Sequence, residues 1–232
     1  MTIYQQYFNR DKKRIAVLLD PDKMTVETAK KYAALIETSP ADMIFVGGSL
    51  VFSSVSQIVK ALKTKTQKPV VLFPGSASQV TGEADALLFL SLISGRNPEY
   101  LIGEHVKGAF NVKKSGIEVI PTGYILVDGG GVTSVQYVSN TMPVPADKPD
   151  IAVATALAGE LLGLKCFYLE AGSGAKNPVS AEMISSVRQN ISSPLIVGGG
   201  IRSLEAANQA FNAGADIVVI GTAFEKNPEF FC

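Results

Sequence analysis

Two glycine-rich turns near the end of the chain are well suited to bind an anion. GGGIRS runs from Gly198 to Ser203 and IGTAF from Ile220 to Phe224, and each turn follows an apolar run. Glycines leave backbone N–H groups bare, and two consecutive turns of this kind after the last two strands of a (β/α)8 barrel form a phosphate site. The turns therefore predict a phosphorylated small molecule as the ligand. The alternative is that the glycines only tighten the chain between strand and helix.

A second group of candidate residues lies where the first two apolar runs end. In LLDPDK, Leu18 to Lys23, the proline stops the run and directs the carboxylate of Asp20 towards the mouth of a barrel. In GGS, Gly47 to Ser49, a hydroxyl follows the next run. Mg²⁺ takes few protein ligands and keeps water or phosphate oxygens for the rest, so Asp20 and Ser49 are the predicted metal ligands. A structural Asp-Pro turn, and Ser49 as the N-cap of the next helix, are the alternatives.

The third group is YLEAGSGA, Tyr168 to Ala175, which ends a later apolar run. Its small residues let backbone N–H groups approach an anion, and Glu170 places a carboxylate directly beside them. A proton acceptor next to a phosphate grip suits a phosphate ester that carries a hydroxyl group, so Glu170 is the predicted general base. The alternative is a carboxylate that pairs with a lysine.

Other polar residues near these turns have roles that the sequence leaves open. Asp22 suits a cap of the following helix, and Lys23 suits contact with an anion or with solvent. Arg96, in SGRNP, is expected either to hold a diphosphate or to stabilise its own loop. The single histidine, His105, is predicted to be a structural or surface residue on a helix. One histidine and no Ser or Cys triad argue against nucleophilic hydrolysis and against a His-rich metal site.

The elements that position these residues alternate along the chain. Strand-like apolar runs and helical patterns in alternation predict βα units and a parallel sheet, here a single (β/α)8 TIM barrel over residues 1–232. Helical patterns lie at Val26–Ile36, Leu50–Leu62, Ala181–Gln189 and Leu204–Ala213. The eight strand-like runs are Ile15–Leu19, Met43–Val46, Val70–Phe73, Ala86–Leu90, Ile117–Ile120 with Ile125–Val127, Phe167–Leu169, Leu195–Val197 and Ile217–Ile220.

Three segments depart from a regular barrel. Pro74–Glu83 is rich in Gly and Ser, so we expect a loop in place of the third helix. Asp128–Pro149 is predicted to be a long connection of the kind that often forms a lid or a binding loop. Only Glu225–Cys232 follow the final glycine turn, so the last helix is expected to be short.

Composition limits the partners and the compartment. Lys plus Arg equals Asp plus Glu at 21 each, so no nucleic-acid partner is predicted. The N-terminus lacks the apolar core of a signal peptide, and charged residues interrupt the most apolar stretch, Ile151–Leu169, which is predicted to be a helix running into a strand and not a membrane span. Cys166 and Cys232 have no metal or redox spacing and fit a cytoplasmic location, with Cys166 in the core.

Taken in order, these motifs closely resemble the geranylgeranylglyceryl phosphate synthase family, which includes the heptaprenylglyceryl phosphate synthases. Many phosphate-binding barrels share single glycine turns, whereas LLDPDK, SGRNP and YLEAGSGA in this order are specific. The resemblance spans nearly the whole chain and is carried by LLDPDK, VGGS, SGRNPEYLIGEH, PTGYILV, YLEAGSGA, VGGGIRS and IGTAF.

The resemblance implies a Mg²⁺-dependent prenyltransferase that joins sn-glycerol 1-phosphate to a polyprenyl diphosphate, geranylgeranyl diphosphate in the branch that this chain resembles. The metal positions of the family correspond to Asp20 and Ser49. Some members carry a lysine two places before the aspartate, where this chain has Leu18, so that phosphate contact is missing. The glycerol phosphate positions correspond to Tyr168, Leu169, Glu170, Ala171, Gly172, Ser173, Gly174, Gly199, Gly200, Gly221 and Thr222.

In the mechanism that this resemblance implies, Mg²⁺ neutralises the leaving diphosphate and the glycerol 3-hydroxyl attacks the allylic carbon while Glu170 accepts its proton. An apolar channel for the prenyl chain is expected between the loops of strands two to four and the helix that starts near Pro98. The resemblance and the apolar segment Ile151–Leu164 favour a homo-oligomer, a dimer or a hexamer, and a lipid product implies transient contact with a membrane surface.

Two other classes of protein remain open at this point. An isomerase or lyase acting on a phosphorylated sugar would share GGGIRS and IGTA, and it would need a second acid or base, for which Asp128 is the candidate. A non-catalytic ligand-binding barrel would keep the phosphate turns and lose the metal-binding acid. The presence of both Asp20 and Glu170 favours an enzyme.

Overall fold

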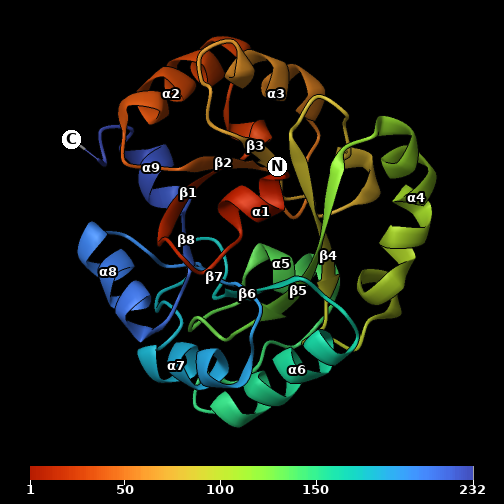
Figure 1. Ribbon diagram of the computed structural model, residues 1–232, viewed down its shortest axis with the longest axis vertical. Helices are drawn as coiled ribbons and strands as arrows, with labels where there is room; N and C mark the ends of the chain where they lie inside the picture. The colour runs from red at the N-terminus through yellow and green to blue at the C-terminus, as the bar shows by residue number, and fades with distance from the viewer. Residues whose placement is uncertain (232) are drawn as a thin grey trace.

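The strands of this chain form one closed sheet. In the computed structural model, which describes residues 1–231, eight parallel strands pair in sequence order and the last pairs with the first. Figure 1 shows the strands at the centre and the longer helices in a ring around them. The predicted (β/α)8 barrel is confirmed. The strands are β1 Arg14–Leu19, β2 Met43–Val46, β3 Val70–Leu72, β4 Ala86–Leu92, β5 Glu118–Leu126, β6 Cys166–Glu170, β7 Leu195–Gly198 and β8 Ile217–Ile220.

The helices follow the predicted alternation, including its irregular places. Only the 3-10 turn η2, Ala77–Gln79, separates β3 from β4, and the final helix α9, Thr222–Lys226, has five residues. A loop in place of the third helix and a short last helix are thereby confirmed. The other helices are α1 Ile3–Tyr7, α2 Val26–Thr38, α3 Val55–Lys63, α4 Glu104–Ser115, α5 Ser134–Ser139, α6 Pro149–Leu161, α7 Ala181–Asn190 and α8 Leu204–Ala213, with a 3-10 turn η1 Pro21–Lys23 and a π-helix η3 Glu99–Gly103.

The strands β2, β3, β7 and β8 are buried at every residue, which explains their unbroken apolar sequences. In β6, Cys166 and Tyr168 point into the barrel, whereas Phe167 and Leu169 pack between the sheet and the helices. Cys166 is thus a core residue at the start of a strand, as predicted, and burial raises the pKa of its thiol to about 12. Cys232 lies outside the described residues.

Serine and threonine hydroxyls mark where five of the helices, α2, α3, α5, α7 and α8, begin. Thr25, Ser54, Thr133, Ser180 and Ser203 each accept a hydrogen bond from a backbone N–H in the first turn of the helix that follows. The helix predicted from Leu50 therefore begins five residues later, at Val55. These caps exclude Ser49 and Asp22 as helix caps.

Strand β5 runs without a break through PTG, Pro121 to Gly123, where the sequence suggested two separate runs. The residue pair Phe89 and Pro121 lies in register between β4 and β5. A Cβ atom on Gly123 would lie 2.7 Å from the ring of Phe167, so glycine here serves close packing and not a turn.

The amino-terminal end of the barrel is closed by α1. The carboxylate of Glu118 accepts hydrogen bonds from the amides of Ile3 and Tyr4 at 2.6 and 2.8 Å. Phe8, directly after α1, enters the barrel and stacks on Phe45 at 6.4 Å between ring centroids. The carboxyl ends of the strands, where barrel enzymes have their sites, are at the other end.

The apolar stretch Ile151–Leu169 is divided between α6 and β6, as predicted. Among the described residues, 1–231, no helix has the combined length and apolar character needed to span a bilayer.

Candidate active site

Three glycine turns lie at the carboxyl ends of the neighbouring strands β6, β7 and β8. Gly172, Gly199 and Gly200 have φ angles of 97°, 82° and 73°, in the left-handed region of backbone conformation that favours glycine. The hydroxyls of Ser173 and Thr222 lie 3.2 Å apart, which joins the turn after β6 to the turn after β8. The structure thus brings the predicted phosphate residues of three strands together at one end of the barrel.

Not all residues of the β6 turn present groups to this site. The side chains of Leu169 and Ala171 are buried between the strands and the helices. The amide of Ala171 donates to the carbonyl of Gly198 at 3.1 Å. The amides of Ser173 and Gly174, in contrast, donate no hydrogen bond to any other residue among 1–231, and these are the N–H groups best placed for an anion.

Glu170 lies at the end of β6, buried with 5% of its surface exposed. Its Oε1 accepts the amide N–H of Gly172 at 2.7 Å, and a Cβ atom on Gly199 would lie 2.5 Å from the same oxygen. Burial raises the pKa of Glu170 to about 7, against the opposing effect of the Tyr168 hydroxyl and the Gly172 amide. A carboxyl with this pKa is half ionised near neutral pH, which is the condition for a general base.

Asp20 and Ser49 lie at the ends of the paired strands β1 and β2. A Cβ atom on Gly48 would lie 3.5 Å from Oδ1 of Asp20, so the carboxylate rests against the turn that carries Ser49. One carboxylate and one hydroxyl are hard oxygen donors that fit Mg²⁺ when it keeps water and phosphate oxygens as its other ligands. No cluster of three or more His, Cys, Asp and Glu side chains is found in the described part of the chain, so the protein supplies only part of a coordination sphere.

Two residues hold the turn between β2 and α3 in place. The carboxylate of Asp22 accepts the amides of Phe52 at 3.0 Å and Ser53 at 2.7 Å, which ties the β1 loop to the β2 loop. Desolvation is the largest single influence on the pKa of Asp22 and raises it, but the hydrogen bonds from Phe52 and Ser53 together outweigh it and lower the pKa. The side-chain amide of Gln79, from the loop after β3, donates to the carbonyl of Gly48 at 2.9 Å. The turn is therefore fastened from both neighbouring loops.

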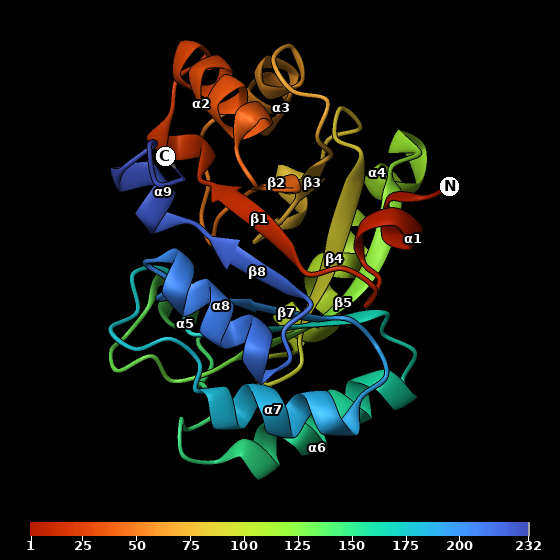
Figure 2. The ribbon, with the colours of Figure 1, turned by 60° about the vertical axis from the view of Figure 1, so that its left-hand side comes forward.

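Lys23 and Glu225 stand beside Asp20. The ammonium of Lys23 lies 2.9 Å from Oε2 of Glu225 and 3.3 Å from Oδ2 of Asp20. Partial burial works against its charge, but the two carboxylates outweigh this and raise the pKa of Lys23. Figure 2 shows α9, which carries Glu225, at the end of the barrel to which the arrows of β1 and β8 point.

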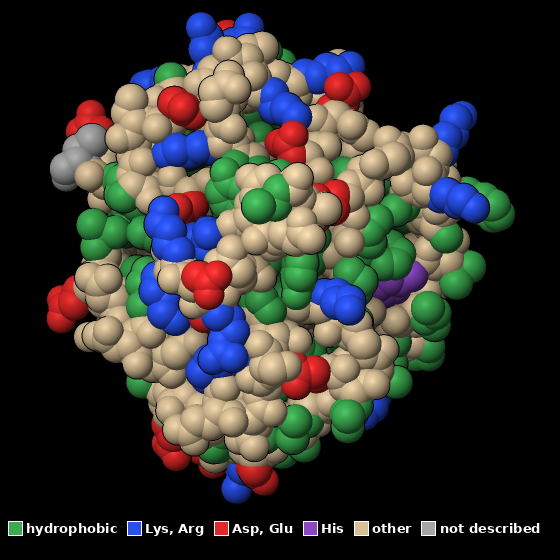
Figure 3. Space-filling model, in the orientation of Figure 1, with side chains coloured by type: hydrophobic (Ala, Val, Ile, Leu, Met, Phe, Trp, Pro, Cys, Tyr) green, Lys and Arg blue, Asp and Glu red, His purple; other side chains and the backbone are tan. Residues whose placement is uncertain are grey.

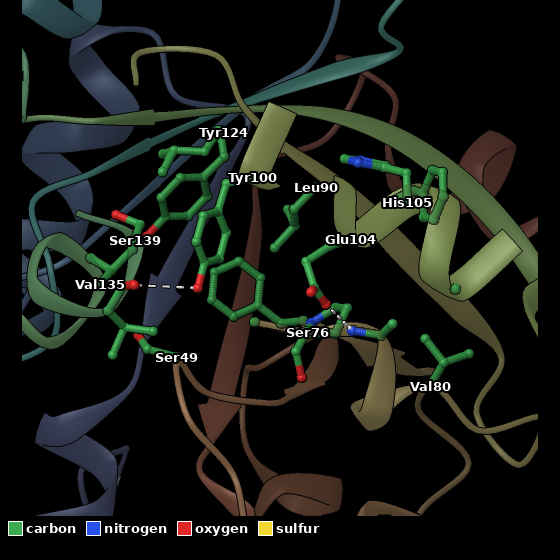
Figure 4. Close-up of a pocket in the computed structure, with 18 of the residues that line it drawn as sticks. Ser49, Ser76, Val80, Leu90, Tyr100, Glu104, His105, Tyr124, Val135 and Ser139 are labelled. Atoms are coloured by element: carbon green, nitrogen blue, oxygen red, sulfur yellow. Dashed lines mark hydrogen bonds between the residues drawn. The ribbon is translucent and has the colours of Figure 1, made fainter. Parts of the chain in front are cut away.

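An apolar pocket begins at Gly48 and Ser49 and extends to α4 (Figure 4). Apolar side chains dominate its lining, among them Val80, Leu87, Phe89 and Leu90, as is usual for small-molecule sites. Phe73, Tyr124 and Tyr168 form an aromatic cluster with ring centroids 5.2 to 6.0 Å apart, and the first two line the pocket. The pocket lies where the sequence predicted an apolar channel, between the loops of β2 to β4 and the helix after Pro98.

Comparison with known proteins separates the predicted family from other phosphate-binding barrels. The model of the PcrB family matches residues 8–231. The chain belongs to the PcrB family. The geranylgeranylglyceryl phosphate synthase of Chitinophaga pinensis is 54% identical over 228 residues, which cover 97% of this chain and 90% of the relative. That of Thermococcus gammatolerans is 49% identical over 212 residues, which cover 90% and 83%. The family resemblance, and with it an enzyme of the geranylgeranylglyceryl phosphate synthase type, is confirmed.

A solved structure of a geranylgeranylglyceryl phosphate synthase shares the whole barrel. The (S)-3-O-geranylgeranylglyceryl phosphate synthase of Thermoplasma acidophilum, in complex with its substrate sn-glycerol-1-phosphate, has a TM-score of 0.93 at 34% identity and covers 100% of this chain and 94% of its own. An N-acetylmannosamine-6-phosphate 2-epimerase from Clostridium perfringens, with a TM-score of 0.60 at 14% identity over 90% and 86% of the two chains, shares the fold alone.

The structure resolves the polar residues whose roles the sequence left open. The guanidinium of Arg96 donates to the carbonyl of Gly95 at 2.8 Å and so stabilises its own loop. The carboxylate of Asp128 accepts a hydrogen bond from the amide of Gly130 at 2.8 Å in an exposed turn, so its position fits a structural role in that turn and not that of a catalytic acid or base. His105 is buried against Phe89, at 4.4 Å between centroids, and desolvation lowers its pKa. His105 is thus structural, as predicted, and it also lines the apolar pocket.

Sequence reasoning missed Gln79 and Glu225. Gln79 lies in a segment predicted only as a loop, and its side chain is buried with the amide group donating to the carbonyl of Gly48. Glu225 was assigned to a short tail, although it contacts both Asp20 and Lys23. The available signal was the barrel closure itself, because β8 pairs with β1 and so brings the residues after each strand together.

Proposed function

We propose that this member of the PcrB family forms an ether bond between sn-glycerol 1-phosphate and a polyprenyl diphosphate, with geranylgeranyl diphosphate as the donor, and releases diphosphate and geranylgeranylglyceryl phosphate. The observation that carries the proposal is the place of Glu170. Its carboxyl lies in the glycine turns on one side, and its charge acts on Tyr124 and Tyr168 on the other, where burial is the main cause that raises the pKa of both hydroxyls. Glu170 would therefore accept a proton between the glycine turns, which are proposed to bind phosphate, and the apolar pocket.

The acceptor phosphate is assigned to the turns after β6, β7 and β8. The free amides of Ser173 and Gly174 and the start of α9 at Thr222 offer N–H groups to an anion. The relative from Thermoplasma acidophilum with bound sn-glycerol-1-phosphate supports this acceptor at 34% identity. When the phosphate is bound at these turns, the glycerol hydroxyls lie near Glu170, whose carboxylate contacts Gly172 of the same turn.

Mg²⁺ is assigned to Asp20 and Ser49, because a carboxylate and a hydroxyl at the ends of two paired strands supply the hard oxygen donors that this ion prefers. When bound, the ion would supply positive charge to a leaving diphosphate. Glycine at position 48 leaves the space beside Asp20 open, since its missing Cβ would lie 3.5 Å from the carboxylate.

The donor chain is assigned to the apolar pocket that begins at Ser49. A diphosphate near Asp20 and Ser49 places the first carbons of the prenyl chain at the mouth of the pocket, with its aromatic wall of Phe73 and Tyr124. Aromatic faces stabilise positive charge, which suits an allylic carbon that gains carbocation character as its C–O bond breaks. The apolar walls keep water away from that carbon.

The reaction follows from these places. The C–O bond between the allylic carbon and the diphosphate breaks, and the electron pair leaves with the diphosphate. The 3-hydroxyl oxygen of glycerol phosphate bonds to the same carbon, and Oε1 or Oε2 of Glu170 takes the proton. The amide of Gly172 holds this carboxylate in place at 2.7 Å.

A homo-oligomer, a dimer or a hexamer, is proposed on the outer faces of two helical segments. Across η3 and α4, the residues Ile102, Val106 and Phe110 are spaced four apart and point outward, with Phe110 86% exposed. On α6, the exposed residues include Leu161 at 88%. Figure 3 shows hydrophobic side chains gathered around the single histidine, at the side where α4 lies in Figure 1. Apolar faces of this kind mark interaction surfaces.

The cytoplasm is the proposed location, with transient contact at a membrane surface when the lipid product leaves. Nucleic acid is not expected as a partner, because the charges balance at 21 of each sign. No observation favours the isomerase or lyase alternative, since Asp128 is occupied in an exposed turn.

The proposal is tested by incubating the purified protein with sn-glycerol 1-phosphate, Mg²⁺ and either geranylgeranyl or heptaprenyl diphosphate, and by detecting the products by mass spectrometry. Geranylgeranylglyceryl phosphate is expected as the main product, with none in excess EDTA. Absence of both prenylated products from a folded protein would contradict the proposed activity, and a larger yield from the C35 donor would correct the chain length alone.

A further inference from the structure

One carboxylate, that of Glu225, holds both the backbone and the counter-ion of Asp20. Its Oε1 accepts the amide N–H of Asp20 at 3.1 Å, and its Oε2 accepts the ammonium of Lys23 at 2.9 Å. The same ammonium lies 3.3 Å from Oδ2 of Asp20. The side chain proposed to bind a divalent cation therefore already faces a cation that belongs to the protein.

The ammonium is attached unequally to its two carboxylates. The contact with Glu225 has hydrogen-bond length and alignment, whereas the contact with Asp20 is a longer ion pair. The side chain of Glu225 is 12% exposed and that of Asp20 27%, so the less exposed of the two carboxylates is also the closer one. If the ammonium of Lys23 moved away from Asp20, Glu225 would remain as its counter-ion.

We propose that Lys23 is the counter-ion of Asp20 when no divalent cation is bound, and that Glu225 retains Lys23 when the cation takes its place on Asp20. This inference rests on the proposed metal site. The retained ammonium opposes binding of the free cation by charge repulsion and favours a diphosphate that arrives with it, because a diphosphate carries more negative charge than one divalent cation neutralises. Lys23 and Glu225 are thus positioning residues that favour binding of metal and diphosphate together.

Two variants are expected to change metal affinity in opposite directions. Lys23→Met removes the competing charge, so the affinity for Mn²⁺ alone, measured by calorimetry, rises about 1.5- to 5-fold, the range for a partly exposed ion pair. Glu225→Gln keeps an oxygen for the amide of Asp20 but loses the attraction for Lys23, which then stays on Asp20, so the affinity falls by about the same factor.

Lys12→Met is the matched control. Lys12 forms an exposed pair with Asp42 at 3.0 Å, before the starts of β1 and β2 at the opposite end of the barrel. The Lys12→Met substitution removes the same positive charge as Lys23→Met but far from Asp20, so the affinity for Mn²⁺ is expected to stay at the wild-type value. Thermal melting establishes that each variant is folded.

Inorganic pyrophosphate supplies the second readout. With Mn²⁺ saturating, its affinity is expected to fall about 1.5- to 5-fold in Lys23→Met, the reverse of the change for the metal alone. Shifts of Mn²⁺ affinity in the same direction in Lys23→Met and Glu225→Gln, or no shift in either, would overturn the inference. Equal Mn²⁺ binding by wild type and Asp20→Asn would instead remove the metal site, and with it both this inference and that part of the proposed function.

Discussion

Replacing Glu170 by Gln separates the proton acceptor from the shape of the site. Gln keeps an oxygen for the amide of Gly172, which lies 2.7 Å from Oε1, and it fills nearly the same volume. It cannot accept the proton of the glycerol hydroxyl. The turnover rate is therefore expected to fall by about 10² to 10⁴, the range for loss of a general base.

The raised pKa adds a second, independent expectation. Because the pKa of Glu170 is about 7 in the folded protein and 4.5 for a glutamate side chain free in water, the folded state binds this proton more tightly than the unfolded state. Below pH 4.5 the carboxyl is protonated in both states and costs nothing; the cost grows as the pH rises towards 7 and is constant above it. The full cost is about 3 kcal/mol, so Glu170→Gln is expected to be more stable than wild type at pH 8 by up to that amount.

The assay combines initial rates at saturating substrates with urea unfolding, both between pH 5 and 8. The wild-type rate should rise with pH through about 7 as Glu170 ionises. The Gln variant should be slow at every pH while its stability advantage grows from pH 5 to pH 7. An unchanged rate in a variant that is more stable would show that Glu170 is buried for another reason, and a variant less stable at pH 8 would refute the raised pKa.

Three further outcomes follow from the site. Asp20→Asn should remove most activity with the melting temperature within a few degrees of wild type, and full wild-type turnover in excess EDTA would contradict the metal assignment. Gly199→Ala should lose about 1–3 kcal/mol of stability and most activity, because its φ is 82° and its Cβ would lie 2.5 Å from Glu170; urea unfolding and initial rates measure both. Sedimentation at micromolar concentration should show a species larger than 24.5 kDa, and a monomer alone would refute the oligomer.

The barrel could be predicted because its strands are buried on both faces. Runs such as Ile217–Ile220 are apolar throughout, and several of the intervening helices begin at Ser or Thr caps that the sequence displays. β5 was predicted as one strand made of two apolar runs with a gap between them. The gap includes Gly123, which packs against the ring of Phe167, a contact 44 positions away that no local pattern reveals.

The candidate site could be predicted only as far as it lies on strand ends. Asp20, Ser49, Glu170 and the glycine turns each follow an apolar run, and parallel strands bring such positions to one end of the barrel. The contact between Asp20 and Glu225 joins residues 205 positions apart. The sequence displayed Lys23 as a cation near Asp20, but it did not reveal that Glu225 binds this lysine. Residues that act through another side chain leave no periodic signal.

The handedness of the product tests the central claim most directly. The phosphate turns fix one end of the acceptor and Glu170 meets its terminal hydroxyl, so the two enantiomers differ in the site by the side on which C2 carries its hydroxyl. We expect the walls of the site to accept only one of these two arrangements. Wild type supplied with geranylgeranyl diphosphate and an equal mixture of the two glycerol phosphate enantiomers is expected to give product from sn-glycerol 1-phosphate almost alone, as measured by chiral chromatography with mass spectrometry. A racemic product would contradict the assignment of both the turns and Glu170.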